Sequence, residues 1–202
     1  MTNIDTIVFD FGGVLIDWNP RHVFRQLFDD EEKMEWFLSN VCTDEWNVQQ
    51  DKGRLLHEAT ALLKASSHSD HHELIEAYYG RWEEMLKGEI SETVEILHEL
   101  RKEFKVYGLT NWSAETFPIA QQRFPFLQVF DGIVVSGEEK MIKPDPAIFQ
   151  LLMSRYNIKA EQSLFIDDNI KNVAAARQLG FEAIQFTTAD ELRTQLRDLK
   201  LI

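Results

Sequence analysis

The chain has 202 residues, which fits one domain or one domain with an insertion, and its 44% hydrophobic residues can form a sizeable core. Thirty-four acidic against 21 basic residues give a net charge of −13, which argues against nucleic acid or an anionic membrane surface as a partner. No apolar run approaches the roughly 20 residues that span a bilayer, the first residues lack signal-peptide features, and Cys42 is the single cysteine. We therefore expect a cytoplasmic protein without an internal disulfide.

The first predicted element is a short strand that ends at Phe9, where apolar residues follow one another without polar alternation. Such a run is typical of a strand buried on both faces of a parallel sheet. Asp10 comes directly after it, at the edge where open α/β sheets gather their ligands. Gly12 and Gly13 let the backbone turn tightly and bring N–H groups close to an anion. The alternative is an aspartate that ends a strand in an ordinary turn.

The next stretch, from residue 19 to about residue 88, has helical spacing of apolar residues and no convincing strand. Four of the five tryptophans lie in or beside it. A helical block between a first strand and later α/β units is typical of an inserted cap. We expect residues 16–88 to form an all-helical cap, and residues 1–15 and 89–202 to form the core domain.

An alternating pattern of helices and strands resumes after the cap. Further strands are predicted over residues 104–109, 132–135, 163–166 and 183–186. Helices are predicted from Ser91, after Ser113, from the Asp145-Pro146 pair, up to Gly180 and after Thr188. Together with the first strand, this pattern predicts a doubly wound, Rossmann-like parallel sheet with right-handed crossovers.

Polar side chains also follow three of the later strands. They are Thr110 with Asn111, Lys143, and Asp167 with Asp168. In a parallel sheet these loops open at the same edge as Asp10, so we expect one site built from all of them. Each residue taken singly would also fit a turn, a helix cap or a solvated loop.

The charges of these residues constrain one another. Three carboxylates, on Asp10, Asp167 and Asp168, would repel each other unless their pKa values rise or a cation binds. Mg²⁺ suits such oxygen ligands and commonly takes one or two carboxylates together with phosphate and water. Lys143 supplies a second cation, and Thr110 and Asn111 supply uncharged donors for phosphoryl oxygens. A carboxylate held beside Mg²⁺ and lysine can attack phosphorus and form an aspartyl-phosphate.

These residues, in this order, resemble the four motifs of the haloacid dehalogenase (HAD) superfamily. The sequence from Asp10 to Val14 resembles the first motif, and Thr110-Asn111 resembles the second. Lys143-Pro144 resembles the third motif, and Asp167-Asp168 with Asn172 resembles the fourth. The resemblance covers the whole chain and implies a Rossmann-like core with the helical cap of subfamily I. It also implies Asp10 as the nucleophile, and metal ligation by Asp10, the Gly12 carbonyl and Asp168, with Asp167 as a helper.

One position departs from the usual phosphatase pattern of this superfamily. The pattern has a second aspartate two residues after the nucleophile, as general acid and base, and here that position is Gly12. General acid help contributes roughly 10²–10⁴-fold, so turnover is slow or the proton comes from the cap or the substrate. The first motif and the Asp-Asp-Asn fourth motif also resemble the sugar-1-phosphate phosphatase-like and epoxide-hydrolase N-terminal-like branch.

The resemblance leaves three functions to weigh. A Mg²⁺-dependent phosphatase of a small phosphorylated metabolite, such as a sugar phosphate, agrees best with the paired Asp167 and Asp168. A 2-haloacid dehalogenase also lacks the second acid, but it needs no metal, and the acidic pair would be a liability there. A phospho-ligand or protein-binding module that lost turnover at Gly12 is the third alternative. These residues do not specify a particular substrate or an oligomeric state.

Substrate choice would lie with the cap. Trp18 stands at its first hinge, and Trp46 and Asp51 are the other candidates for contact with substrate, although tryptophan in a helical bundle more often belongs to the core. A further group of polar residues superficially suggests a metal site, and it consists of His68, Asp70, His71 and His72. Polar residues in a loop before a helix are more typical of a solvated surface, so we do not expect a metal there.

Overall fold

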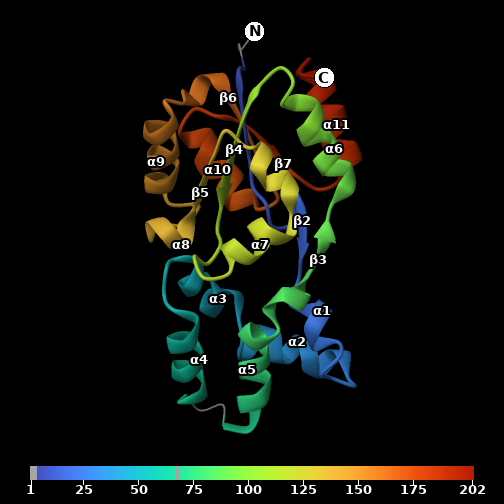
Figure 1. The fold of residues 1–202 in the computed structure, drawn as a ribbon, viewed down its shortest axis with the longest axis vertical. Helices are drawn as coiled ribbons and strands as arrows, with labels where there is room; N and C mark the ends of the chain where they lie inside the picture. The colour runs from blue at the N-terminus through green and yellow to red at the C-terminus, as the bar shows by residue number, and fades with distance from the viewer. Residues whose placement is uncertain (1–3, 67–68) are drawn as a thin grey trace.

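The computed structural model describes residues 4–66 and 69–202 of the chain. Within these residues a five-stranded parallel sheet has the order β5-β4-β1-β6-β7, with β1 at its centre (Figure 1). The strands are β1 (Thr6–Phe9), β4 (Lys105–Thr110), β5 (Gly132–Val135), β6 (Ser163–Asp167) and β7 (Glu182–Gln185). All five predicted strands are present, which confirms the α/β class and the Rossmann-like parallel sheet.

The register of the central strands determines which residues meet at the carboxyl edge. Phe9, the last residue of β1, lies opposite Gly108 of β4 and Ile166 of β6. All four residues of β1 are buried, as expected for a central strand. The residues just beyond these three paired positions therefore lie side by side at one edge of the sheet.

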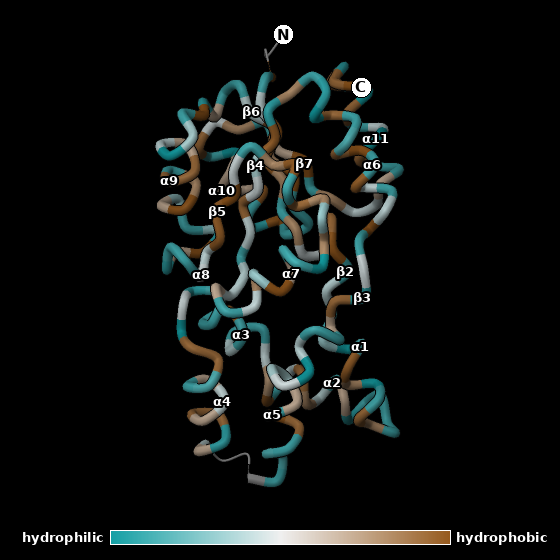
Figure 2. Tube along the Cα trace, viewed as in Figure 1, coloured by the Kyte–Doolittle hydropathy of each residue, from teal (hydrophilic) through white to brown (hydrophobic). Residues whose placement is uncertain are grey.

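Helices cover both faces of the sheet. The core helices are α6 (Ser91–Leu100), α7 (Phe117–Arg123), α8 (Ser136–Glu139), α9 (Pro146–Tyr156), α10 (Ile170–Gln178) and α11 (Ala189–Asp198), with short 3₁₀ turns η3 (Pro125–Val129) and η4 (Ala160–Gln162). Because side chains alternate along a strand, Ile7 and Phe9 share one buried cluster with α6, α7 and α11, whereas Val8 shares another with α9 and α10. Hydrophobic segments run along the strands between these layers (Figure 2).

Several predicted helix ends are confirmed in detail. The Asp145 side chain accepts a 2.9 Å hydrogen bond from the backbone N–H of Ala147 at the start of α9. The Thr188 hydroxyl accepts a 3.2 Å bond from the backbone N–H of Glu191 and caps α11. Gly180 follows α10 with a φ of +96°, the left-handed conformation that favours glycine. Local side-chain chemistry therefore sets these boundaries.

The inserted segment forms a separate group of helices beyond the carboxyl edge of the sheet, in the lower half of Figure 1. Its elements are α1 (Arg21–Phe24), α2 (Glu31–Asn40), α3 (Asp44–Asp51), α4 (Leu56–Lys64), η1 (Ser69–His71), α5 (His72–Gly80) and η2 (Trp82–Met85). We call this group the cap. Every helix in the described parts of the chain, cap and core alike, is too short or too polar to span a bilayer.

Two short strands join the cap to the core, and the prediction of an all-helical segment over residues 16–88 was wrong at both ends. Strand β2 (Ile16–Trp18) pairs antiparallel with β3 (Leu86–Glu89), and Ile16 lies opposite Glu89. Strand β3 contains a glycine and two charged residues in four positions, so it lacks a strand-like apolar pattern. It becomes a strand because the cap folds back and brings it beside β2.

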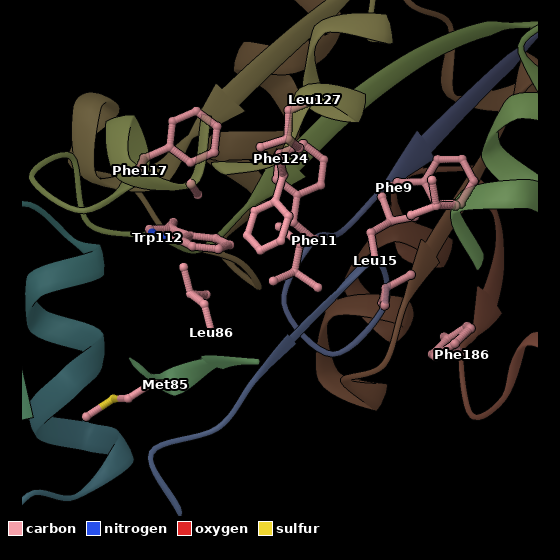
Figure 3. Packing of buried hydrophobic residues seen from close by; sticks show 14 of the residues in the cluster. Phe9, Phe11, Leu15, Met85, Leu86, Trp112, Phe117, Phe124, Leu127 and Phe186 are labelled. Atoms are coloured by element: carbon pink, nitrogen blue, oxygen red, sulfur yellow. The ribbon is translucent and has the colours of Figure 1, made fainter. Parts of the chain in front are cut away.

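The buried core continues from the sheet through this junction. Phe11 stacks on Phe117 with a centroid distance of 6.2 Å, and Trp112 packs edge-on against Phe117 at 5.8 Å. Figure 3 shows Met85 and Leu86, from the returning end of the cap, on the Trp112 side of this aromatic group. All five residues belong to one hydrophobic cluster, so the cap and the core are packed together rather than merely tethered.

Candidate active site

The loops after the central strands bring the predicted charged residues together. Lys143 is fully buried, and its Nζ lies 2.9 Å from Oδ2 of Asp10 and 2.7 Å from Oδ2 of Asp167. Asp10 follows β1, Asp167 ends β6, and Lys143 comes from the loop before α9. The edge of a parallel sheet thus collects groups that are far apart in the sequence.

Asp167 is held by several donors at once. Nδ2 of Asn172 donates to both carboxylate oxygens, at 3.0 Å each. The backbone N–H of Asn169 donates a 2.8 Å bond, and the Lys143 ammonium donates another. A buried carboxylate with this many donors is satisfied and rigid. Asp167 can therefore orient Lys143, and its expected role as a helper in metal binding stays a prediction.

Asp10 lies in a different electrostatic environment. Burial raises the pKa of the Asp10 carboxyl, the ammonium of Lys143 opposes this, and the carboxylates of Asp167 and Asp168 raise it further. Asp10 and Asp167 also raise the pKa of Lys143 against the effect of burial. One lysine is thus shared by a group of three carboxyls, so a further cation would favour their charged forms.

The three carboxyls are arranged so that they can hold such a cation. Asp10, Asp167 and Asp168 each offer an oxygen, and these oxygens lie within 4.8 Å of one another. Asp168 is exposed, whereas the other two are buried. Its Oδ2 lies only 2.6 Å from where a Cβ of Gly13 would be, and Gly13 has a φ of +74°. The glycine turn therefore leaves room for the third carboxylate, and this oxygen-rich set fits Mg²⁺.

The hydroxyl of Thr110 is available to bind a ligand. Its Oγ1 is buried and has no hydrogen-bond partner among the described residues. An unsatisfied buried hydroxyl costs about 1–3 kcal/mol. Thr110 ends β4 at the same edge as Asp10, so a ligand oxygen bound there would satisfy it.

Asn111 has a role that the sequence did not predict. Its Oδ1 accepts a 2.8 Å bond from the backbone N–H of Lys143, and its Nδ2 donates a 2.9 Å bond to the Lys143 carbonyl. We expected Asn111 to bind phosphoryl oxygens together with Thr110. That role stays a prediction, and the structure adds that the amide joins two loops and positions Lys143.

A cavity of about 60 Å³ lies beside these groups, between the cap and the core. Gly12 and Asn111 line it from the core, and Trp18 and Asp51 line it from the junction and the cap, so contact of the latter two with substrate stays a prediction. Trp46 does not line it. The Trp46 ring packs against Tyr78 and Tyr79 at 5.1 and 5.2 Å and is part of the cap's own packing.

Three aromatic residues of the cavity were not among the predicted substrate contacts. They are Tyr79, Trp82 and Trp112. Trp112 directly follows the Thr110-Asn111 pair, and this position in the sequence could have indicated that it lies near the site. Tyr79 and Trp82 come from the C-terminal part of the cap, about 30 residues before Trp112, and only the folded chain brings them to the cavity. His68, one of the four polar residues that superficially suggested a metal site, lies outside the described residues.

Direct hydrogen bonds join the cap to the core near this cavity. The Ser136 hydroxyl donates a 2.5 Å bond to the carbonyl of Asp51, and it accepts a 2.9 Å bond from the backbone N–H of Trp112. The backbone N–H of Leu56 donates a 2.8 Å bond to Glu115. These bonds hold the cap against the loops at the carboxyl edge of the sheet.

Comparison with known proteins identifies a family. The model of the haloacid dehalogenase-like hydrolases matches residues 4–180. The sesquiterpene phosphatase astK of Aspergillus oryzae is 26% identical over 98% of this chain and 97% of its own length. The D-ribitol-5-phosphate phosphatase of Bacteroides thetaiotaomicron is 24% identical over 96% and 97%. The drimenol cyclase drtB of Aspergillus calidoustus is 35% identical over 47% of this chain, which covers only 18% of that protein.

Solved structures share the fold. A HAD family enzyme from Bacteroides thetaiotaomicron, in complex with magnesium and inorganic phosphate, aligns with a TM-score of 0.66 at 24% identity, over 91% of this chain and 94% of its own. A dehalogenase with an intermediate complex aligns with a TM-score of 0.74 at 18% identity, over 96% and 98%. At these identities the likeness establishes the fold alone.

Proposed function

Because the chain belongs to the haloacid dehalogenase-like hydrolases, we propose that it is a Mg²⁺-dependent phosphatase of a small phosphorylated metabolite. The observation that carries this proposal is the position of the Lys143 Nζ, 2.9 Å from Asp10 and 2.7 Å from Asp167. Asp168 offers a further oxygen beside these two carboxyls. Relatives that span the whole chain have names of phosphatases, which supports the same reaction class.

In the proposed reaction Asp10 is the nucleophile. One of its oxygens attacks phosphorus, the bond to the leaving oxygen breaks, and water later hydrolyses the aspartyl-phosphate. Lys143 neutralises the nucleophile and the transferred group, Asn111 keeps Lys143 in place, and the Thr110 hydroxyl donates to a phosphoryl oxygen.

Magnesium would be held by Asp10, Asp168 and the carbonyl of Gly12, with Asp167 nearby. When bound, it supplies positive charge that stabilises the phosphoryl oxygens. The acidic set fits this ion, since three carboxylate oxygens converge where Lys143 is the one cation paired with them in the part of the chain that the structure describes.

The cavity also indicates the kind of leaving group. Its described lining includes three tryptophans and a tyrosine but no lysine, arginine or histidine. Lys143 is already occupied by two carboxylates. We therefore expect a phosphomonoester whose remaining part is small and uncharged, with hydroxyls or a flat face, such as a sugar phosphate.

A metal-independent 2-haloacid dehalogenase is the competing function. Gly12 favours it, because halide leaves without a proton and a dehalogenase needs no acid there. The three carboxyls around one lysine argue against it, since without a cation they repel an anionic substrate and each other.

The first experiment is hydrolysis of p-nitrophenyl phosphate with Mg²⁺ and then with EDTA. This leaving group needs little protonation, so the glycine at position 12 should not hide the activity. We expect release that requires Mg²⁺ and disappears in Asp10→Asn. Halide release from 2-chloropropionate in EDTA would establish the dehalogenase instead. Binding of phosphate without turnover of either compound would indicate a binding module.

A further inference from the structure

The phosphatase chemistry proposed above has no acid at position 12, where the usual pattern places a second aspartate. Gly12 stands where a second carboxylate would be, and a Cβ there would meet no atom within 4 Å. An alkoxide leaving group has to be protonated as its bond to phosphorus breaks, so some other group near Gly12 must supply the proton.

Asp51 is the carboxyl that the cap places at this position. It is the last residue of α3 and lines the same cavity as Gly12. Among the described lining residues it is the one carboxyl, and the others there are aromatic, amide, hydroxyl or glycine. Gly12 lies two positions after Asp10, so this cavity is next to the nucleophile and can receive the leaving group of a substrate held there.

The fold holds Asp51 in place through both its backbone and its side chain. Its carbonyl accepts the 2.5 Å bond from Ser136, and Nδ2 of Asn47 lies 3.4 Å from its Oδ2. Burial raises the pKa of Asp51 to about 7, although the backbone N–H of Ser113 lowers it by donating to the carboxylate. A substantial fraction of this side chain therefore carries a proton near neutral pH.

We propose that Asp51 is the general acid of the reaction and donates its proton to the leaving-group oxygen, in place of the side chain absent at Gly12. The inference rests on the proposed phosphatase function and deepens it. It assigns the cap a chemical role in addition to lining the cavity.

The step balances without any further reactant. Asp10 Oδ forms a bond to phosphorus while the bond from phosphorus to the leaving oxygen breaks, and the proton of Asp51 passes to that oxygen. The products are a neutral alcohol, an aspartyl-phosphate and the Asp51 carboxylate. The carboxylate then takes a proton from the water that attacks the aspartyl-phosphate, which releases phosphate and restores the acid.

Asp51 could instead serve only to seat the cap, through the Ser113 and Asn47 contacts. Dependence on the leaving group separates the two roles. We would measure kcat/KM with Mg²⁺ for p-nitrophenyl, phenyl and benzyl phosphate, whose leaving groups are increasingly basic, in the wild type and in Asp51→Asn. Asparagine can still accept the Ser113 N–H bond through its amide oxygen but has no acidic proton to transfer. The matched control is Glu45→Gln, which removes one exposed carboxylate from the same helix.

For Asp51→Asn we expect a loss of at least ~100-fold with benzyl phosphate and less than ~5-fold with p-nitrophenyl phosphate. Asp51→Glu, which keeps a carboxyl, should retain part of the benzyl phosphate activity. An equal loss on all three substrates, or no loss, would overturn the proton-donor role while leaving the phosphatase function intact. If the wild type hydrolyses none of the three compounds with Mg²⁺, the proposed function itself fails.

Discussion

The side-chain amide of Asn111 makes two hydrogen bonds to the backbone of Lys143, one to its N–H and one to its carbonyl, at 2.8 and 2.9 Å. A residue just after one strand thereby controls where Lys143 is placed, 32 positions later in the chain. The position of the Lys143 ammonium between Asp10 and Asp167 depends on this link.

Asn111→Ala removes both of these bonds. We expect kcat/KM for p-nitrophenyl phosphate to fall at least ~10-fold and the free energy of unfolding to fall by about 1–3 kcal/mol. Steady-state kinetics and urea denaturation would measure the two effects. Asn40→Ala, at an exposed position at the end of α2, is the control and should change neither. Full activity in Asn111→Ala would contradict the positioning role.

Asp10→Asn should abolish Mg²⁺-dependent hydrolysis and leave the fold intact. The amide cannot form the covalent intermediate. Burial and the neighbouring carboxylates already disfavour the charge of Asp10, so its loss should not destabilise the core. Phosphate release and circular dichroism would check these outcomes, with exposed Asp5→Asn as the control. Near-normal turnover would remove Asp10 from the nucleophile role.

Gly12→Asp restores a carboxyl on the core side, where the backbone leaves space for a side chain. In the Asp51→Asn background we expect it to raise benzyl phosphate turnover at least ~10-fold, because either carboxyl can then protonate the leaving oxygen. Gly12→Asn in the same background adds similar bulk without an acid. Equal turnover in the two double variants would show that no proton donor was missing.

Gly13→Ala should weaken the metal site. At a φ of +74° an alanine is strained, and its Cβ would lie 2.6 Å from Oδ2 of Asp168. We expect a loss of stability of about 1–2 kcal/mol and a higher Mg²⁺ concentration for half-maximal activity. Gly88→Ala is the control, since a Cβ there meets nothing within 4 Å. An unchanged Mg²⁺ requirement would place the metal away from Asp168.

Substrate charge provides a further test of the cavity. With no free cation among its described lining residues, the cavity should reject a second phosphate. We expect pyrophosphate to be hydrolysed with a kcat/KM at least ~10-fold below that of benzyl phosphate. Comparable values would mean that the second phosphate finds a cation outside this cavity.

Much of the core fold could be predicted because its signals are local. Val8 and Phe9 lie in an apolar run, and such runs mark strands that are buried on both faces. Asp145 and Thr188 cap helices through bonds to residues two or three positions away. Strand β3 gave no such signal, since its strand conformation depends on pairing with β2.

The candidate site divides in the same way. The sequence by itself determined which chemical groups gather at the sheet edge, because parallel strands end on the same side, so Asp10, Lys143 and Asp167 had to converge. Only the tertiary structure decided how the remaining groups are used. It turned Asn111 toward the Lys143 backbone, packed Trp46 into the cap, and brought Asp51 to the cavity beside Gly12. The physical reason is that the strands follow from local patterns and parallel strands end at one edge, whereas the direction of a side chain in a loop or in the cap depends on the neighbours that the folded chain brings to it.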